Sequence, residues 1–305
     1  MVSGLEALVR EIIDDESSGA AQLTVRTANL FLKLIEGGKP TMRSVRKLVK
    51  LLSEARPSMP SITNMAYRIS QMIDEQVSKK VDLREAIKFA VSSAIKEYQS
   101  QISSVIGNAS EKLREYAVIL THSYSSTVAA ALEQCRGLRV YVTESRPGME
   151  GRRLAERLAR MGLEVVLIVD SAASYVLDRG HVDAVVTGCD AILDDCSIVN
   201  KIGTKVIALA ASEMGVPFIV VTDLWKAAVH GISLEERAPE EVYEGKLPNL
   251  SSLNPYFEIV PSKLITSFIT DEGVLKPSRL VKKIEEMWGH IAAQNKTSLR
   301  RLKTI

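Results

Sequence analysis

The sequence predicts an α/β protein in which an N-terminal helical domain precedes a C-terminal domain built on a doubly wound parallel sheet. Over residues 1–110 apolar side chains recur every three or four positions, which is the spacing of amphipathic helices. Beyond residue 110, short β-branched runs alternate with helix-length segments, the pattern of parallel strands joined by helical crossovers. The chain has 305 residues, 46% of them hydrophobic, enough to bury a sizeable core. We therefore expect domains at 1–110 and 111–305.

Helix boundaries in the first domain are marked by residues that cannot continue a helix. The segment Gly37–Pro40 ends one helix, and Thr41 is the expected N-cap of the next. The segment Arg56–Pro60 contains two prolines and interrupts the helical pattern again. Further helices are expected at Ile62–Gln76 and from Leu83 to about Gln99, which completes a helical bundle or cap.

Six apolar runs are the expected strands of the second domain. They are apolar along their whole length, as strands are when a parallel sheet is covered on both faces. The runs are Val118–Leu120, Val140–Val142, Val165–Val169, Ala184–Thr187, Phe218–Val221 and Ile265–Ile269. The intervening segments Gly151–Met161 and Lys201–Met214 are long enough to form right-handed crossover helices. We therefore expect a Rossmann-like sheet.

Neither a cofactor nor a metal is expected from the sequence. A dinucleotide site would need the pattern G-x-G-x-x-G after the first strand, but Thr121–Ser126 (THSYSS) stands there. The cysteines Cys135, Cys189 and Cys196 have no His or Cys partner at short spacing, which argues against a zinc site and a disulfide framework. Three reduced and partly buried thiols are the expected outcome.

Charge and hydropathy exclude two further classes of partner. Lys and Arg number 39 against 37 Asp and Glu, which gives a net charge of +2 without a long block of like charges. Direct binding of nucleic acid is therefore not expected. Glu6 and Arg10 precede any long apolar run, and no later stretch approaches membrane-spanning length. We expect a cytoplasmic protein without a membrane partner.

Polar residues follow five of the expected strands, at positions that share one edge of a parallel sheet. These segments are Thr121–Ser126, Thr143–Arg146, Asp170–Ser171, Gly188–Asp190 and Thr222–Lys226. Ligands of such sheets bind outside the carboxyl ends of the strands. Hydroxyl-rich turns that open helices, with Arg146, Lys201 and Lys226 nearby, can hold an anion through backbone N–H groups and side-chain charge. A small phosphorylated molecule is the expected ligand.

Each of these loops has a plainer alternative when it is taken singly. Ser and Thr at such positions are ordinary helix N-caps, and Asp170 is equally explained as a cap of the following helix. His122 is expected to pack or hydrogen-bond locally rather than to titrate for chemistry. Only the convergence of the five loops at one edge favours a binding site.

Taken together, several segments resemble the family that unites the α, β and δ regulatory subunits of translation initiation factor 2B with sugar-1-phosphate aldose–ketose isomerases. The segments, in the order that the family has, are Arg56-Pro57, Thr121–Ser126, Val140–Pro147 (VYVTESRP), Asp170–Ala173, Gly188–Asp190, Asn200–Thr204 (NKIGT), Asn254–Glu258 (NPYFE) and Pro261. Of these, Asn200–Thr204 is the most specific. The resemblance implies the same two-domain fold and a homodimer or higher homo-oligomer formed through the second domain.

The resemblance, added to the strand-end argument, completes the expected set of ligand residues. The set is Gly19, Ala20, Arg56, Ser126, Arg146, Asn200, Lys201 and Lys226. In the isomerases, which act on methylthioribose 1-phosphate or ribose 1,5-bisphosphate, a cysteine after the first strand works with an aspartate after the fourth. Asp190 matches this aspartate, whereas Ser123 stands at the cysteine position. A thiol with a reference pKa of about 8.5 exchanges protons near neutrality, and a serine hydroxyl does not without a dedicated base.

Two further sequence differences from the isomerases favour a regulatory protein over an enzyme. Ser18 stands where the isomerases have an arginine before Gly-Ala, and Asp194-Asp195 replace an Asn-Gly and add negative charge near the expected phosphate. We therefore expect a regulatory protein similar to the α subunit of initiation factor 2B. It would bind a sugar phosphate or nucleoside phosphate without turnover, and the α subunit of initiation factor 2 would be its macromolecular partner. The alternative is an aldose–ketose isomerase.

Overall fold

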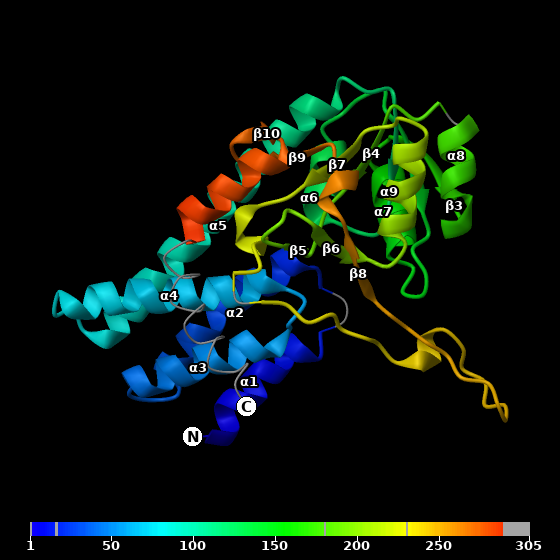
Figure 1. The fold of residues 1–305 in the computed structure, drawn as a ribbon. Helices are drawn as coiled ribbons and strands as arrows, with labels where there is room; N and C mark the ends of the chain where they lie inside the picture. Colours follow the sequence, from blue (N-terminus) through cyan, green and yellow to red (C-terminus); the bar gives the residue numbers. More distant parts are fainter. Residues whose placement is uncertain (1, 16–17, 180, 230, 289–305) are drawn as a thin grey trace.

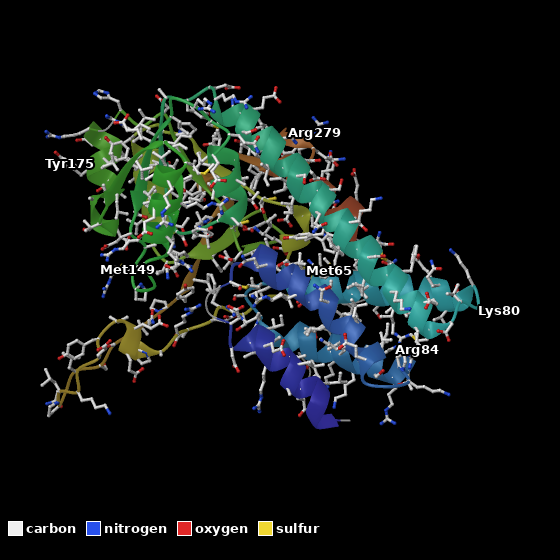
Figure 2. The ribbon with its side chains drawn as sticks, turned by 180° about the vertical axis from the view of Figure 1, so that it is seen from behind. Met65, Lys80, Arg84, Met149, Tyr175 and Arg279 are labelled. Carbon is white, nitrogen blue, oxygen red and sulfur yellow. The ribbon has the colours of Figure 1, made fainter. Side chains whose placement is uncertain are left out.

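The computed structural model describes residues 2–15, 18–179, 181–229 and 231–288. Figure 1 shows a helical part and an α/β part side by side, with one long helix running along both. Figure 2, drawn from behind, places Lys80 and Arg84 at the outer end of the helical part and Tyr175 at the opposite end of the molecule. The molecule is therefore elongated, and its two parts meet near the middle.

Five amphipathic helices form the helical part. They are α1 (Val2–Ile13), α2 (Ala20–Glu36), α3 (Met42–Ala55), α4 (Pro60–Ser78) and α5 (Leu83–Leu113). Thr41 caps α3 as predicted, because its side chain accepts a hydrogen bond from the Ser44 N–H while the Ser44 hydroxyl interacts with the Thr41 N–H. The break predicted at Arg56–Pro60 is confirmed, since α3 ends at Ala55 and α4 begins at Pro60.

Helix α5 is longer than the sequence predicted. Its expected end lay near Gln99, but the helix continues without interruption to Leu113. Its first half, with Ala86 and Tyr98, belongs to the core of the helical part, whereas Val105 and Leu113 belong to the core under the sheet. One helix thus crosses the expected domain boundary between residues 110 and 111. The division into domains at this position stays a prediction.

The predicted Rossmann-like, doubly wound sheet is confirmed. Seven strands lie in the order β10-β9-β7-β4-β1-β2-β3, and all neighbours are parallel except β10, which is antiparallel to β9. The strands are β1 (Val118–Thr121), β2 (Arg139–Thr143), β3 (Glu164–Ile168), β4 (Ala184–Thr187), β7 (Phe218–Val221), β9 (Ser267–Thr270) and β10 (Gly273–Leu275). Each of the six predicted runs overlaps one of them.

Helices cover both faces of this sheet. On one face α5, α6 (Ser126–Leu132) and α7 (Glu150–Arg160) pack against alternate side chains of the strands, such as Ile119 and Val140. On the other face lie α8 (Ala173–Arg179) and α9 (Thr204–Glu213), packed against the neighbouring side chains, such as Leu120 and Val185. This alternation is what a strand side-chain period of two requires when both faces are covered.

A second sheet of three antiparallel strands was not predicted. It has the order β5-β6-β8 and consists of β5 (Ala191–Ile192), β6 (Ile198–Lys201) and β8 (Phe257–Val260). The prediction that a helix starts at Lys201 was wrong, because Lys201 ends β6 and α9 starts only at Thr204. Gly203 separates the strand from the helix with a φ of 101°, a conformation that glycine adopts at no steric cost.

The two parts of the molecule share apolar contacts around Trp225. This residue lies in η2 (Leu224–Lys226) and packs edge-to-face against Tyr98 of α5, with ring centroids 5.7 Å apart. Trp288, in a helix whose described residues are 277–288, packs against the same indole, with centroids 5.5 Å apart. Three further short turns, η1 (Asp170–Ala172), η3 (Pro239–Glu241) and η4 (Ser262–Leu264), complete the described elements.

Residues 238–253, called the arm below, extend away from the body of the protein (Figure 1). Three leucines of the arm are solvent-exposed, Leu247 by 57%, Leu250 by 49% and Leu253 by 73%. None of the helices in the described residues combines the length and the apolar character needed to cross a bilayer.

Candidate active site

A cavity lies where the carboxyl edge of the sheet meets the start of α2. About 820 Å³ of space lies between its lining residues, and this volume includes open solvent. Its walls come from the turns after β1 and β4, the end of β6, the first turn of α7 and the segment before α4. The residues singled out from the sequence that line it are Gly19, Ala20, Arg56, Ser123, Ser126, Asp190, Asn200, Lys201 and Lys226. The structure therefore brings together side chains from both parts of the chain.

Arg146 lies apart from this group. It is exposed, and it is not among the residues that line the cavity. The Asp170 carboxylate accepts hydrogen bonds from the backbone N–H groups of Ser145 and Arg146, both at 2.7 Å, and so fixes the loop after β2. Asp170 therefore holds a neighbouring loop instead of capping its own helix by its side chain. The role of Arg146 as an anion ligand stays a prediction that the cavity does not support.

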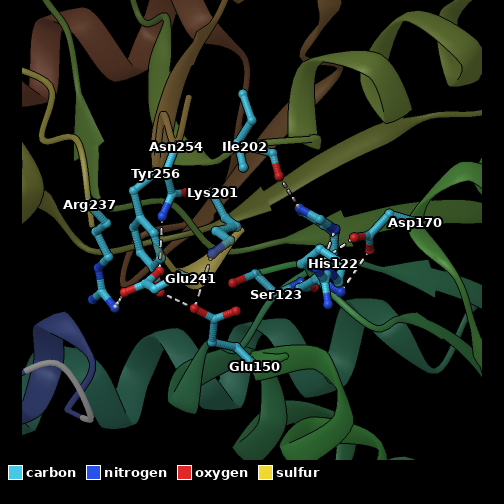
Figure 3. Close-up of polar contacts among 12 residues, drawn as sticks. His122, Ser123, Glu150, Asp170, Lys201, Ile202, Arg237, Glu241, Asn254 and Tyr256 are labelled. Carbon is cyan, nitrogen blue, oxygen red and sulfur yellow. Dashed lines mark hydrogen bonds and ion pairs between the residues drawn. The ribbon is translucent and has the colours of Figure 1, made fainter. Parts of the chain in front are cut away.

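The turn after β1 is held by His122 and presents Ser123 to the cavity (Figure 3). The His122 Nε2–H donates to the Ile202 carbonyl at 2.9 Å, so Nδ1 accepts from the Thr143 hydroxyl at 2.6 Å. Burial lowers the pKa of His122, which keeps the ring neutral. The expectation that His122 hydrogen-bonds locally is confirmed. Ser123 itself has a φ of 64°.

Two helices open onto the cavity. Ala20, the first residue of α2, and its N-cap Gly19 line the cavity, and Gly19 provides no side-chain hydrogen bond to the helix. Ser126 and Thr127, the first residues of α6, line it as well. Backbone N–H groups and the positive end of the helix dipole favour an anion at such positions.

Asp190 lies in the turn after β4 and, among the described residues, is one of two acidic side chains that line the cavity, the other being Glu150. Its backbone N–H donates to the Val199 carbonyl at 2.8 Å, which places the carboxyl next to the end of β6. Desolvation by the surrounding protein raises the pKa of Asp190 to about 6, although Lys226 and Arg56 act in the opposite direction. A carboxyl with such a pKa can take up and release a proton near neutral pH.

Lys226 and Cys189 flank Asp190. The Lys226 Nζ lies 3.7 Å from an oxygen of Asp223. Burial alone would lower the pKa of Lys226, but Asp223, Cys189 and Asp190 together outweigh it and the pKa is raised, so the ammonium stays charged. Burial raises the pKa of the Cys189 thiol to about 12, and its Sγ lies 3.1 Å from the Thr222 hydroxyl. Cys189 is therefore inert near neutral pH and cannot replace a thiol at position 123.

Lys201 is held in a network that the sequence did not reveal. Its Nζ lies 3.2 Å from Glu150 Oε1 and 3.5 Å from the centre of the Tyr256 ring, and the Tyr256 hydroxyl donates to the same Glu150 oxygen (Figure 3). The Arg237 guanidinium lies 3.7 Å from the centre of that ring. All four side chains line the cavity. Tyr256 belongs to the NPYFE stretch, but nothing in the sequence marks Glu150 or Arg237.

Arg56 is buried at the side of the cavity formed by the helical part. Its Nε lies 3.2 Å from Glu235 Oε2, and its Nη1 donates to the Asp15 carbonyl at 3.1 Å. The other Glu235 oxygen accepts from the Ser58 hydroxyl at 2.5 Å. Three of the cavity's cations, Arg56, Lys201 and Lys226, thus have carboxylate partners within the chain. The described residues contain no group of three or more His, Cys, Asp or Glu side chains able to hold a metal ion.

The fold and this cavity define an α/β protein with a polar site at the sheet edge, closed by a helical part. The chain belongs to the initiation factor 2 subunit family, which it matches over residues 1–277. It is 33% identical over 238 residues to ribose 1,5-bisphosphate isomerase of Methanocaldococcus jannaschii, covering 74% of this chain and 75% of that protein. It is 37% identical over 190 residues to methylthioribose-1-phosphate isomerase of Carboxydothermus hydrogenoformans, covering 55% of each.

Solved structures of both kinds of family member are similar to this chain. The translation initiation factor eIF-2B of Pyrococcus horikoshii OT3 superposes with a TM-score of 0.77 at 26% identity, covering 91% of this chain and 98% of that one. The 5-methylthioribose 1-phosphate isomerase of the same organism has a TM-score of 0.73 at 27% identity, with coverages of 93% and 88%. The fold alone therefore does not separate the two kinds of member.

The sequence comparisons overturn the expectation of a regulatory subunit, because relatives that are 33–37% identical are named as sugar-phosphate isomerases. One argument for that expectation also fails in the structure. Asp194 and Asp195 do not line the cavity. The Asp195 carboxylate instead accepts hydrogen bonds from the N–H and the hydroxyl of Ser197, both at 2.8 Å, within the turn between β5 and β6. Their charge is therefore not directed at a ligand.

Proposed function

We propose that this chain is an aldose–ketose isomerase acting on a phosphorylated pentose, with ribose 1,5-bisphosphate and methylthioribose 1-phosphate as candidate substrates. One observation carries the proposal: the Asp190 carboxyl, whose pKa is raised to about 6, lies in a cavity lined by Arg56, Lys201 and Lys226. The names of the 33–37% identical relatives support the same activity. The partnership with initiation factor 2 depended on the regulatory interpretation and is withdrawn with it.

The reaction requires two proton movements. When a cyclic aldose 1-phosphate becomes a ketose 1-phosphate, the bond between C1 and the ring oxygen breaks, the C2 proton moves to C1 and the O2 proton moves to the ring oxygen. The phosphate stays on O1. We assign the carbon-bound proton to Asp190, because a carboxylate with a pKa near 6 is a stronger base than an ordinary aspartate and still exists in both forms near neutrality. Ser123 supplies a hydroxyl beside the reacting carbons and no acid–base group.

We place the phosphate among the backbone N–H groups at the starts of α2 and α6 and the side chains of Arg56, Asn200 and Lys226. Helix N-termini and charge-assisted hydrogen bonds are the usual means of holding such a group. Asn200 is suited to this role because its side-chain N–H₂ already donates to Thr204 at 3.0 Å, which holds the amide in one orientation. These assignments rest on the cavity geometry and on the family resemblance.

We also propose that the chain forms a homodimer through the α/β part. The arm supports this proposal, since Leu247, Leu250 and Leu253 are exposed on it in this single chain. Clustered apolar side chains on an extended segment are typical of a surface that a second chain covers. Oligomers of one chain are most often twofold symmetric dimers.

An assay of ketose 1-phosphate formation from each of the two substrates tests the isomerase proposal. We expect turnover with at least one of them, and a loss of at least a hundredfold in kcat for Asp190→Asn. The rate should rise with pH through about 6 as Asp190 loses its proton. Asp194→Asn removes the same charge from an exposed position outside the cavity and should leave the rate unchanged. Absence of turnover with both substrates at any pH between 5 and 9 would refute the proposal.

A further inference from the structure

Glu235 lies in an extended segment that joins the α/β part to the helical part just before the arm. The Arg237 N–H donates to the Asn254 carbonyl at 3.1 Å, which fixes this segment to the stretch that leads into β8. Glu235 and Arg237 are half-buried, whereas Glu236 between them is exposed, as expected when side chains alternate along an extended chain. Arg237 lines the cavity, and Glu235 contacts Arg56, which lines it as well.

The Glu235 carboxylate is fixed by the loop between α3 and α4. Its Oε1 accepts hydrogen bonds from the Ser58 N–H at 3.3 Å and from the Ser58 hydroxyl at 2.5 Å. Its Oε2 accepts from the Arg56 Nε–H at 3.2 Å. Ser58 is fully buried and Arg56 is only 6% exposed. Three donors from one buried loop therefore hold the carboxylate in one place.

The Arg56 guanidinium is in turn held at two of its three nitrogens. Its Nε–H donates to Glu235, and its Nη1 donates to the Asp15 carbonyl at 3.1 Å. Because a guanidinium is planar, these two bonds fix its plane and the direction of the N–H groups that they leave over. A phosphate in the cavity thus meets a cation whose orientation is already set. Ordering a long side chain on binding otherwise costs about two- to tenfold in affinity.

The geometry also separates this role from that of a competing anion. A carboxylate that competed with phosphate would occupy the cavity and would have to leave when the ligand binds. Glu235 is not among the residues that line the cavity. Its bonds to Ser58 hold it outside the space that a ligand would fill, so it can stay in place when a phosphate binds.

We propose that Glu235 is a positioning residue for the ligand's phosphate: held by Ser58, it orients the Arg56 guanidinium toward the cavity. Glu235 touches no ligand and acts through Arg56 alone. The proposal rests on the proposed function, since it presumes a phosphorylated ligand in the cavity. It gives the segment before the arm, 179 residues further along the chain than Arg56, a part in the half of the site that the helical part supplies.

Calorimetric titration with ribitol 5-phosphate tests the proposal without turnover, because this polyol has no carbonyl and cannot be isomerised. We expect Glu235→Ala to weaken binding roughly threefold or more, although it removes a negative charge. Ser58→Ala leaves every charge in place and loosens the carboxylate, so it should weaken binding about twofold or more. Glu236→Ala is the matched control, since it removes the same charge from the exposed neighbouring position and should leave the affinity unchanged.

The sign of these changes separates positioning from competition. If Glu235 competed with phosphate for Arg56, both Glu235→Ala and Ser58→Ala would tighten binding. Tighter binding in either variant, or unchanged affinity in both, would overturn the proposal.

The Arg56→Lys background separates positioning from a simple link between the two parts of the molecule. A lysine keeps the charge and can still pair with Glu235, but its ammonium has no plane to orient. We therefore expect that Glu235→Ala no longer weakens the binding of ribitol 5-phosphate in this background. An equal loss of affinity in the Arg56 and Lys backgrounds would show that Glu235 only links the two parts, and the proposal would fail.

These measurements do not depend on catalysis. A wild-type chain that binds ribitol 5-phosphate but isomerises neither candidate substrate would contradict the isomerase proposal and leave this one standing. A wild-type chain that binds neither ribitol 5-phosphate nor inorganic phosphate at millimolar concentration would overturn this proposal, whatever its activity.

Discussion

Asn64 on α4 donates a hydrogen bond from its Nδ2 to the backbone carbonyl of Trp225, at 2.7 Å. The same nitrogen donates to the Ala227 carbonyl, at 2.9 Å. These two carbonyls flank Lys226, whose side chain lines the cavity. Asn64 therefore fastens the helical part to the segment that positions a cationic side chain of the site, without itself lining the cavity.

We predict that Asn64→Ala destabilises the protein by about 1–3 kcal/mol, because it leaves the buried Trp225 carbonyl without a donor. The Ala227 carbonyl keeps the Val229 N–H. Urea unfolding would measure the change in the free energy of unfolding. Ser92→Ala is a suitable control, since the Ser92 hydroxyl bonds only the Phe89 carbonyl on the exposed side of α5. A loss no larger than that of the control would show that this link contributes little.

Asp190 should make the protein less stable as the pH rises. Its pKa is raised from 3.8 to about 6 in the folded protein, so the folded state binds the proton more tightly than the unfolded state. The contribution is fully present below about pH 4 and is lost as the pH rises through 6, at a cost of about 3 kcal/mol. Asp190→Asn should therefore be more stable than wild type at about pH 7.5 and nearly equal to it at about pH 3.5 in urea unfolding. Equal stabilities at both pH values would mean that the carboxyl is not desolvated.

We predict that Arg56→Ala weakens the binding of ribitol 5-phosphate roughly 10- to 150-fold, the equivalent of a charge-assisted hydrogen bond of about 1.5–3 kcal/mol. Calorimetric titration would measure it. Arg46→Ala is the matched control, because Arg46 forms an exposed ion pair with Asp74 at 3.1 Å and does not line the cavity. Equal affinities in the two variants would remove Arg56 from the ligand site.

Ser123→Cys should raise kcat at least tenfold. A thiol titrates near neutrality, with a reference pKa of about 8.5, and adds a second acid–base group to the one that Asp190 supplies. Cysteine has no branch at Cβ, so it can take the φ of 64° that Ser123 has. Steady-state rates at pH 7.5 check the prediction, with Ser123→Ala as the control for loss of the hydroxyl. A rate no higher than wild type would place Ser123 away from the reacting carbons.

The dimer should depend on the arm. We expect sedimentation at micromolar concentration to show a dimer for the wild-type chain and a monomer for Leu253→Glu, because Leu253 is the most exposed arm leucine at 73% and a charge there would have to be desolvated in an interface. Phe89→Glu, on the helical part where Phe89 is 50% exposed, should leave the dimer intact. A wild-type monomer would dismiss the dimer proposal as a whole.

Much of the fold could be predicted because its strands are uniformly buried. The runs Ala184–Thr187 and Phe218–Val221 coincide residue for residue with β4 and β7, all of whose residues are buried. The second sheet escaped prediction for two reasons. Its strand β5 has only two residues, and β6 ends in the polar pair Asn200-Lys201, which is not typical of a strand. Its partner β8 lies more than fifty residues further along the chain, so no local pattern reveals the pairing.

The sequence predicted those site residues that lie in the turns after the strands of the sheet. Asp190 and Ser123 lie in the turns after β4 and β1, Ser126 begins the helix that follows β1, and all three line the cavity. Glu150 was not predicted, because an acidic residue in the first turn of an amphipathic helix is normally a solvated one. Its burial results from contacts with Lys201 and Tyr256, which lie 51 and 106 residues further along the chain. Only the folded chain brings these three side chains together.

The length of α5 decides how a ligand can reach the cavity. This helix has 31 residues and spans about 46 Å, and it is built into the apolar core of both parts. Proteins that open by rotating two domains apart do so about a flexible linker. A continuous helix such as α5 instead connects the two parts rigidly. Substrate and product are therefore expected to pass through the part of the cavity that is open to solvent. The rates of substrate binding and product release should then respond to substitutions at that opening. Substitutions along α5 should alter stability alone.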